Sequence, residues 1–451
     1  MGLALLYDAA DRAGRYAAQL DGRSVFPSES AVEALSAFDE PMPNEPASPK
    51  SVLEMLDDFG SPATVAMSGR RYFGFVTGGS LPAALAANWL AGAWDQNAGL
   101  VVCSPTAAKL EAVCAAWLVD LLNLPTGTQV GFVTGATMAN FSALASARHR
   151  VLANVGWNVE EEGLSGAPPI TVIVGEEVHV SLLKALAMLG LGRKRVVRVP
   201  VDGQGRMRAD ALPEIKGPTI VCLQAGNVNT GAFDPARQIC TAAHETGAWV
   251  HVDAAFGLWA SAAPSRAHLM DGVNEADSWA TDGHKWLNVP YDCGLVFVRD
   301  AAAMKAAMSA TQAAYLVEGG TREPSHYTPE LSRRARGIEV WAALKSLGKT
   351  GLAEMIEGTC RHARRFAEVL RAAGYTVPNE VFLNQVLVSF GDDETTSRVI
   401  ARIQTGGVCW CGPTMWQGKS YMRISVSSWA TTEEDVEVCL DAILSAASRP
   451  V

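Results

Sequence analysis

Short apolar runs alternate with helix-like stretches through the middle of this chain, from about residue 105 onward. Near-continuous apolar strands that alternate with helices predict an α/β fold with a mainly parallel sheet sandwiched by helices. Ligands of such sheets bind at the carboxyl ends of the strands. The predicted helices are Ala107–Leu122 and Met138–Leu152, and the predicted strands are Val130–Val133, Ile170–Val174, Val196–Val199, Thr219–Leu223, Trp249–Val252 and Gly294–Val298.

The two ends of the chain have a different pattern. Residues 1–60 mix helical stretches with the irregular segment Pro41–Pro49, and we interpret them as an N-terminal helical arm. Residues 61–335 are assigned to a large domain. The remaining residues, 336–451, predict a smaller α+β domain because helices and strands no longer alternate regularly. This part has a helix-rich stretch up to Ala373, strands near Val386–Ser389 and Met422–Val426, and a final helix from Thr432.

Charge and hydropathy exclude several classes of partner. Charged residues make up 19% of the 451 residues, and the formal net charge is -10. No block of Lys and Arg of the kind that grips phosphate backbones is present, so we do not expect nucleic acid as a partner. No apolar run of about 18 residues could span a bilayer, and charged residues follow the apolar start at once. We therefore expect no membrane association and a cytoplasmic location.

The cysteines point to a reducing environment. The chain has nine of them, an odd number scattered through predicted strands and helices. This usage fits reduced thiols better than a disulfide framework. Cys409 and Cys411 flank Trp410, but no second pair of ligands accompanies them, so no metal site is predicted.

Lys285 is the first candidate for chemistry. It follows His284 in the run Trp279–Trp286, which has apolar and aromatic residues at both ends, and the apolar strand upstream ends in Asp253. A lysine amine can form a Schiff base with the aldehyde of pyridoxal phosphate, while a carboxylate can keep the pyridine nitrogen protonated so that the ring accepts electrons. A buried carboxylate needs a cation, which a pyridinium or an arginine would supply. A strand that ends in Asp also often caps the following helix.

Two further features accompany this pair. The turn Thr134–Thr137 joins a predicted strand to a predicted helix. Its backbone N–H groups and the Thr137 hydroxyl face outward at the positive end of that helix, which is an arrangement that binds phosphate. The same turn also suits an ordinary helix cap. His179 follows a strand-like run, where its imidazole could stack on a cofactor ring, cap a helix or pack in the core.

The ordered set of motifs resembles the pyridoxal-phosphate-dependent group II amino-acid decarboxylases, and within them the aromatic L-amino-acid decarboxylase branch. The resemblance extends from about Ser68 to the C-terminus, with the family's order and spacing. It implies a fold-type I enzyme with pyridoxal 5'-phosphate as cofactor, which works as a homodimer with its active sites at the subunit interface. The matching motifs are Arg71–Gly79, Thr134–Thr137, His179, Asp253–Ala255, His284–Lys285 and Ser332–Arg334.

The same resemblance implies roles for individual residues. Lys285 corresponds to the Schiff-base lysine, Asp253 to the partner of the pyridine nitrogen, and His179 to the imidazole that stacks over the cofactor ring. Ala255 would complete the sandwich around the ring. The other matching positions are Ala136 and Thr137 in the phosphate-binding turn, His284 and Thr77 beside the cofactor, and Phe75 in the substrate-pocket segment.

Tyr315 resembles the tyrosine of the family's catalytic loop and lies in the segment Gln312–Leu316, directly before the Gly-rich stretch Val317–Thr321. The implied reaction is decarboxylation of an L-amino acid to an amine and carbon dioxide, through an internal aldimine at Lys285 and a quinonoid that Tyr315 protonates. A phenylalanine at this position would indicate relatives that form aldehydes. The alternative role for Tyr315 is an aromatic anchor for the loop.

Two positions depart from the family pattern. Asp282 stands where many members carry an asparagine near the phosphate, and a carboxylate there would repel a phosphate unless it turns away. Asn227 or Val228 stands where threonines of the family contact the cofactor, so this contact stays open.

The substrate is the least constrained part of the prediction. Aromatic residues around Phe75 favour an aromatic or bulky apolar amino acid, whereas Arg70 and Arg71 could pair with the second carboxylate of an acidic one. The scaffold also permits another carbon-bond lyase or aldolase, or an aldehyde synthase. A protein that binds the cofactor or a partner without catalysis is a further alternative.

Overall fold

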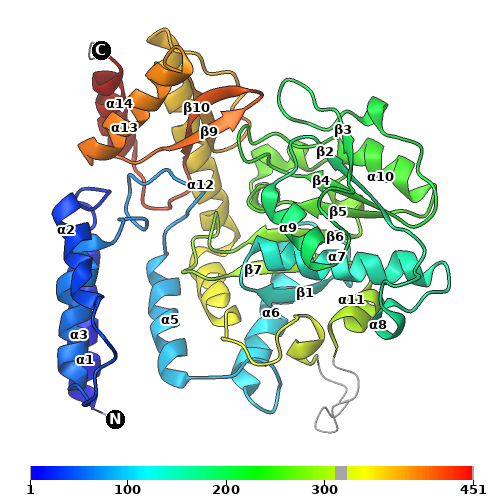
Figure 1. Ribbon diagram of the computed structural model, residues 1–451, viewed down its shortest axis with the longest axis horizontal. Coiled ribbons are helices and arrows are strands. Elements are labelled where there is room, and N and C mark those ends of the chain that lie inside the picture. Colours follow the sequence, from blue (N-terminus) through cyan, green and yellow to red (C-terminus); the bar gives the residue numbers. More distant parts are fainter. Residues whose placement is uncertain (1, 310–321, 449–451) are drawn as a thin grey trace. The chain divides into compact units, whose positions relative to one another are not determined.

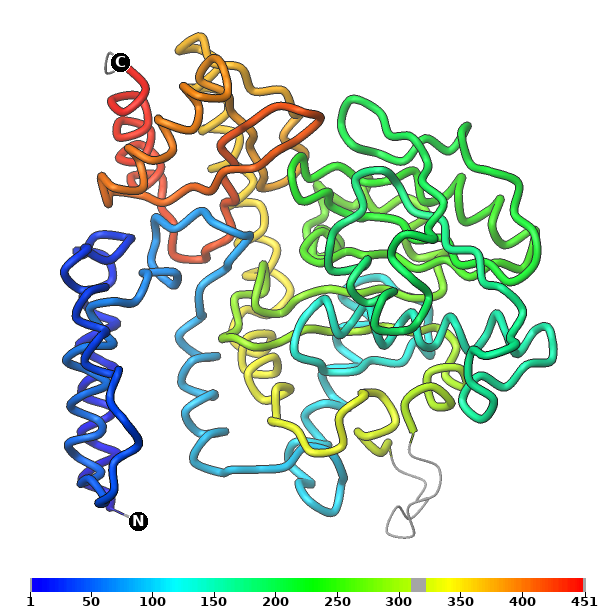
Figure 2. Tube along the Cα trace, in the orientation of Figure 1, coloured from blue at the N-terminus to red at the C-terminus, as the bar shows by residue number. Residues whose placement is uncertain are grey.

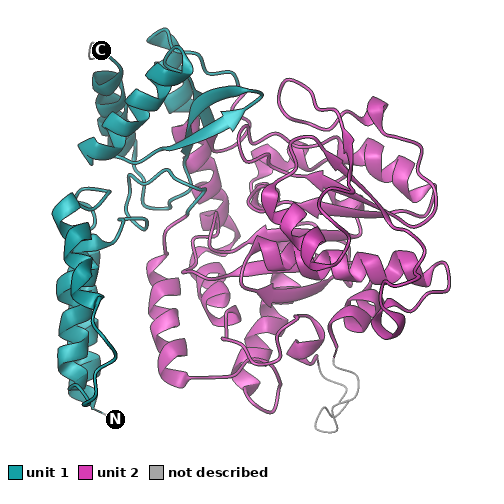
Figure 3. Ribbon diagram, viewed as in Figure 1, with its two compact units in different colours: residues 1–77, 364–378, 386–451 teal, residues 78–363, 379–385 magenta. Residues whose placement is uncertain are grey.

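The computed structural model describes residues 2–309 and 322–448 (Figures 1 and 2). The chain forms two compact units (Figure 3). Unit 1 contains residues 1–77, 364–378 and 386–451, and unit 2 contains residues 78–363 and 379–385. The domain boundaries predicted near residues 60 and 335 stay predictions.

A seven-stranded sheet forms the centre of unit 2 (Figure 1). Its order is β1-β7-β6-β5-β4-β2-β3. The pairs from β3 to β6 are parallel, and β7 runs antiparallel to both of its neighbours. The predicted mainly parallel sheet is therefore confirmed. The strands are β1 (Gln129–Val133), β2 (Thr171–Gly175), β3 (Val197–Val199), β4 (Thr219–Gln224), β5 (Trp249–Asp253), β6 (Ser278–Asp282) and β7 (Gly294–Val298).

Strand β6 is absent from the predicted set, although all five of its residues are buried. Ser278, Thr281 and Asp282 interrupt the apolar pattern that marks the other central strands. Polar side chains are tolerated in a buried strand where they have hydrogen-bond partners, and Ser278 receives such a bond from the indole of Trp249.

One face of the sheet is covered by α7, α9 and α11, and the core lies between them (Figure 1). Alternate residues of the strands point to this face, among them Val172 and Val174 of β2 and Val296 and Val298 of β7. The described helices of unit 2 are α5 (Pro82–Trp94), α6 (Pro105–Leu121), α7 (Ala136–Ala153), α8 (Val159–Glu162), α9 (Val180–Met188), α10 (Ala236–His244) and α11 (Ala301–Met308), with 3-10 helices η3 (Ala209–Ala211), η4 (Gly257–Ala262), η5 (Pro264–Met270), η6 (Val273–Glu275) and η7 (Pro324–His326).

Unit 1 combines short N-terminal helices with a small sheet of order β8-β10-β9. The long helix α12 (Gly337–Ala372) contributes to both units and is interrupted at Gly348, whose φ of 60° and ψ of -175° are not helical. The other elements are α1 (Leu3–Gln19), α2 (Glu29–Glu33), η1 (Ala34–Phe38), α3 (Pro49–Met55), the π-helix η2 (Leu56–Gly60), α4 (Ser61–Ala63), β8 (Gln385–Val388), α13 (Asp393–Gly406), β9 (Gly412–Trp416), β10 (Lys419–Ser425) and α14 (Glu433–Ser448).

No helix within the described residues combines the length and the hydropathy that crossing a membrane requires. All nine cysteines are free thiols.

Candidate active site

The carboxyl ends of several strands bring candidate residues to one edge of the sheet in unit 2. Asp253 ends β5 and Asp282 ends the parallel neighbour β6. Strand β1 runs in the same direction as β6, because both are antiparallel to β7, so the turn after Val133 lies at this edge too. Side chains alternate between the two faces of a sheet along each strand. Asp253 is therefore on the same face as Trp249, and Asp282 on the same face as Ala280, which is the face covered by α7.

Lys285 is held by Asp282. The Nζ atom of Lys285 lies 2.9 Å from Oδ2 of Asp282, and the backbone N–H of Ala136 donates to Oδ1 at 2.6 Å. Ala136 is the first residue of α7, so the carboxylate sits at the positive end of this helix, where a negative charge is favoured. The side chain of Asp282 is only 3% exposed, while that of Lys285 is 18% exposed and can be reached from outside.

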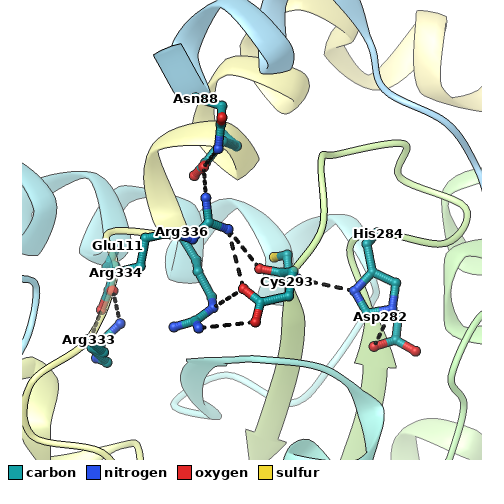
Figure 4. A network of polar contacts seen from close by, with 10 residues as sticks. Asn88, Glu111, Asp282, His284, Cys293, Arg333, Arg334 and Arg336 are labelled. Atoms are coloured by element: carbon teal, nitrogen blue, oxygen red, sulfur yellow. Dashed lines mark hydrogen bonds and ion pairs between the residues drawn. The ribbon is translucent and has the colours of Figure 1, made fainter. Parts of the chain in front are cut away.

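His284 is fixed beside this pair (Figure 4). Its Nδ1 accepts the backbone N–H of Cys293 at 3.1 Å, so the neutral ring carries its proton on Nε2, which lies 3.5 Å from Oδ1 of Asp282. The ring stacks on Tyr291 with 4.3 Å between centroids. Burial lowers the pKa of His284, which keeps the imidazole neutral.

Arg333 and Arg334 of the Ser332–Arg334 motif and the neighbouring Arg336 all form polar contacts (Figure 4), and Arg334 and Arg336 contact Asp292. Arg333 forms a buried ion pair with Glu111, at 2.6 and 2.9 Å. Arg334 donates to the backbone oxygen of Asp292 at 2.8 Å, and Arg336 donates to the Asp292 carboxylate at 3.0 Å. Because Asp292 directly precedes Cys293, these bonds hold the backbone that binds His284.

Asp253 has no protein counter-ion among the residues that the structure describes. Its side chain accepts one hydrogen bond, from the Asn140 amide at 3.0 Å, and the residue is 5% exposed. A buried carboxylate without a cation is costly. The charge of a protonated pyridine ring would remove this cost, so the site fits pyridoxal phosphate at the position predicted for its ring nitrogen.

Two glycines allow backbone segments to approach closely beside the candidate lysine and the candidate phosphate turn. A Cβ on Gly294 would lie 2.4 Å from Cα of Gly135, in the turn between β1 and α7. A Cβ on Gly78 would lie 1.8 Å from the backbone oxygen of Lys285. Both close approaches involve backbone, so no side-chain movement would relieve a substitution. The turn that begins α7 is thereby pressed against β7 with its amide groups at the sheet edge, as phosphate binding requires.

The other predicted cofactor residues lie as follows. His179 caps α9, and its Nδ1 is 2.7 Å from the Ser181 hydroxyl and accepts the Ser181 N–H at 3.2 Å. Thr137 and Ala255 are half-buried, and the Ala255 oxygen accepts the N–H of Asp282 at 2.9 Å. Tyr315 lies outside the described residues.

The segment with Phe75 belongs to unit 1 and contains an aromatic cluster that the sequence analysis does not predict. Phe75 is 62% exposed and its ring lies 5.5 Å from that of Trp410, which stacks on Tyr72 at 5.1 Å. A Cβ on Gly74 would lie 2.3 Å from the Trp410 ring, so only glycine leaves room for this indole. Phe75 and Val76 both have positive φ, 52° and 62°, a strained backbone of the kind found at functional sites.

Three further residues of this segment are engaged within unit 1. Thr77 is buried, and its N–H donates to the Gly74 oxygen. Arg70 forms an ion pair with the Asp21 carboxylate at 3.0 Å, and Arg71 donates to the Asp21 backbone oxygen at 2.9 Å.

Asn227, one of the two positions for which the sequence leaves the cofactor contact undecided, stabilises a turn. Oδ1 of Asn227 accepts the N–H groups of Asn229 and Thr230, at 2.9 and 3.2 Å. This side chain therefore stabilises its own loop.

This combination of an α/β fold and a lysine beside a glycine-lined helix terminus is that of a fold-type I enzyme that uses pyridoxal phosphate. Residues 33–390 match the model of the pyridoxal-dependent decarboxylase conserved domain, and the chain belongs to this family. It is thus a pyridoxal-phosphate-dependent amino-acid decarboxylase.

Individual relatives agree with this membership. The chain is 25% identical to an aromatic-L-amino-acid decarboxylase of Bacillus atrophaeus, over 89% of this chain and 86% of the relative. It is 29% identical to an acidic amino acid decarboxylase of Bos taurus, over 59% of this chain and 53% of the relative. Its fold matches the crystal structure of Oryza sativa TDC with PLP and tryptamine, with a TM-score of 0.90 at 22% identity, over 99% of this chain and 97% of that one.

Proposed function

We propose that the substrate is an aromatic or bulky apolar L-amino acid, which the enzyme converts to the corresponding amine and carbon dioxide. The observation that carries this proposal is the exposed ring of Phe75, in the segment that resembles the family's substrate pocket, with Trp410 packed against it. Stacked aromatic rings favour a planar apolar side chain. The names of the aromatic relatives agree with this choice.

Pyridoxal phosphate, when bound, supplies a sink for the electrons of the bond between the α-carbon and the carboxylate. Lys285 would hold its aldehyde carbon, the turn with Ala136 and Thr137 would hold its phosphate, and His284 would lie beside the cofactor. Asp253 would keep the proton on the pyridine nitrogen. His179 and Ala255 would flank the ring and restrict it to one plane. Tyr315 would donate the proton that the substrate α-carbon requires after carbon dioxide leaves.

One assay tests the reaction: carbon dioxide, amine and aldehyde are measured together with single L-amino acids. We expect equal amounts of carbon dioxide and amine from an aromatic substrate. Products of carbon–carbon cleavage without carbon dioxide would contradict the proposal in favour of an aldolase. Lys285→Ala should abolish both the activity and the visible absorbance of the bound cofactor, whereas Lys216→Ala, at an exposed lysine, should change neither.

A second measurement tests Tyr315. Tyr315→Phe should slow amine release and raise the share of aldehyde, because the α-carbon would lack its proton donor. Products in wild-type proportions at the wild-type rate would assign Tyr315 a structural role.

Decarboxylation of an acidic amino acid is the main alternative. It would need a cation for the second carboxylate, and both candidate arginines, Arg70 and Arg71, are engaged by Asp21. We therefore expect kcat/KM for L-tryptophan to exceed that for L-glutamate. The reverse order would refute the aromatic assignment and leave the decarboxylase reaction in place.

We further propose a homodimer with active sites that both subunits complete. Unit 1 exposes several large apolar side chains on its N-terminal helices, including Leu3, Tyr7, Val52 and Leu56, at 49 to 73% exposure. Exposed apolar patches of this kind mark interfaces. If each site uses residues of both chains, mixing the inactive variants Lys285→Ala and Phe75→Ala should restore activity. A monomer in sedimentation, or no restoration on subunit exchange, would contradict the proposal.

A cytoplasmic location remains part of the proposal. Nine free cysteines suit a compartment that keeps thiols reduced. Cell fractionation followed by immunodetection would test it, and recovery outside the cytoplasmic fraction would refute it.

A further inference from the structure

A buried row of polar side chains leads to Asp253 through the core of unit 2. Trp249, His251 and Asp253 alternate along β5 and therefore share one face of the sheet. Ser278 of β6 is the register partner of His251, and Asn140 comes from α7, which packs on the same face. All five residues are at most 5% exposed.

The five side chains form a continuous chain of hydrogen bonds. The indole Nε1 of Trp249 donates to Oγ of Ser278 at 2.8 Å, and this Oγ lies 2.9 Å from Nδ1 of His251. Nε2 of His251 lies 2.9 Å from Oδ1 of Asn140, whose Nδ2 donates to Oδ2 of Asp253 at 3.0 Å. Every bond has a normal length for its donor and acceptor.

The direction of every bond in this chain is determined. An ionised carboxylate only accepts, so Asn140 must present its NH2 group to Asp253 and its oxygen to His251. Nε2 of His251 then carries the ring proton. Burial lowers the pKa of His251 to about 3, so the ring is neutral and its Nδ1 must accept from the Ser278 hydroxyl. The indole of Trp249 can only donate, so it donates to the Ser278 hydroxyl, and every bond from Trp249 to Asp253 runs in the same direction.

We propose that Asn140 and His251 are positioning residues that hold the Asp253 carboxylate in one orientation, for the pyridine nitrogen of the cofactor. All donors in the row point toward the carboxylate, so the bonds polarise one another in the sense that stabilises its negative charge. They engage Oδ2 alone, and Oδ1 has no hydrogen-bond donor in the described part of the chain. Oδ1 is thus left for the ring nitrogen. The inference rests on the proposed role of Asp253.

Helix α7 links this row to the other carboxylate of the site. Ala136 and Asn140 are one helical turn apart, and they bind Asp282 and Asp253, respectively. The same turn of helix therefore positions the carboxylate beside Lys285 and the carboxylate proposed for the ring nitrogen. Movement of α7 would disturb both distances together.

The test measures protonation of the cofactor in the holoenzyme, independently of turnover. With pyridoxal phosphate labelled with ¹⁵N in its ring, the ¹⁵N chemical shift reports whether the nitrogen carries a proton. Asn140→Leu should move this resonance toward the unprotonated position. It should also lower kcat at least about tenfold, since a hydrogen bond to a charged group is lost, with KM nearly unchanged. Ser146→Ala, on the same helix but outside the row, should behave as wild type.

A second pair of variants covers the case in which Asn140→Leu does not fold. His251→Gln keeps an N–H donor for Asn140, so its resonance should stay at the wild-type position, whereas that of His251→Leu should move. A wild-type resonance in His251→Leu would overturn the inference, and so would one in Asn140→Leu where that variant folds. Failure of the proposed function is a separate result, because it would appear as a wild-type enzyme that releases no carbon dioxide.

Discussion

The buried neutral His251 predicts how stability depends on pH. The pKa of this imidazole is about 3 in the folded protein, against an ordinary value of 6.5, because burial disfavours the charged ring. As pH falls below 6.5, the unfolded chain binds a proton that the folded protein does not bind. The free energy of unfolding therefore falls, by about 1.4 kcal/mol at pH 5.5 and by about the same amount for each further unit toward pH 3.

Urea unfolding of the holoenzyme at pH 7.5 and 5.5, followed by circular dichroism at one protein concentration, measures this difference. His251→Gln has no imidazole to protonate at this site, so its loss of unfolding free energy over the interval should be smaller than that of wild type by about 1.4 kcal/mol. His268→Gln, at an exposed histidine, should keep the wild-type loss. Equal losses in wild type and His251→Gln would refute the argument that His251 stays neutral.

Three other substitutions test the packing around the site. Gly294→Ala should lower stability by about 1–3 kcal/mol in thermal denaturation and weaken cofactor binding, because the phosphate turn must move, while Gly203→Ala, which has open space, should do neither. Ser181→Ala should reduce kcat about twofold to tenfold by removing the hydroxyl that contacts His179 Nδ1, and an unchanged kcat would contradict that role. Trp410→Leu should raise KM for L-tryptophan about twofold to tenfold and leave that for L-glutamate alone, and equal changes would argue against an aromatic subsite.

The strands that the sequence predicts are short runs rich in apolar residues, a composition that reflects burial on both faces of a parallel sheet. Strand β3 is exposed at Val197 and Arg198. Strand β6 lacks this signal, since its polar residues are satisfied by partners that are distant in sequence. Asp253 and Lys285 could be identified as candidates because they lie in recognisable local patterns. Both lie at the same edge of the sheet because β5 and β6, whose carboxyl ends carry them, are parallel.

The supporting residues could not be predicted in the same way. Asn140 is 113 residues from Asp253 and 111 from His251, and it has the sequence context of an ordinary helix residue. One available signal was that His251 lies two positions before Asp253 and so shares its face of β5. Trp410 carried no such signal, because its contact with Phe75 depends on the packing of unit 1. The sequence analysis noted Asp282 only as a departure from the family pattern. Its contacts with Lys285 and Ala136 are seen only in the structure.

The place of β7 in the sheet has a consequence for biosynthesis. Strand β1 lies at the edge of the described sheet, where it pairs with β7. It cannot form this pairing until β7 has been synthesised, up to Val298 opposite Gln129. During translation, the turn that follows β1 leaves the ribosome long before the strand that anchors it. A nascent chain that ends before β7 therefore lacks the strand that pairs with β1, and the turn proposed to bind the phosphate follows a strand without its partner.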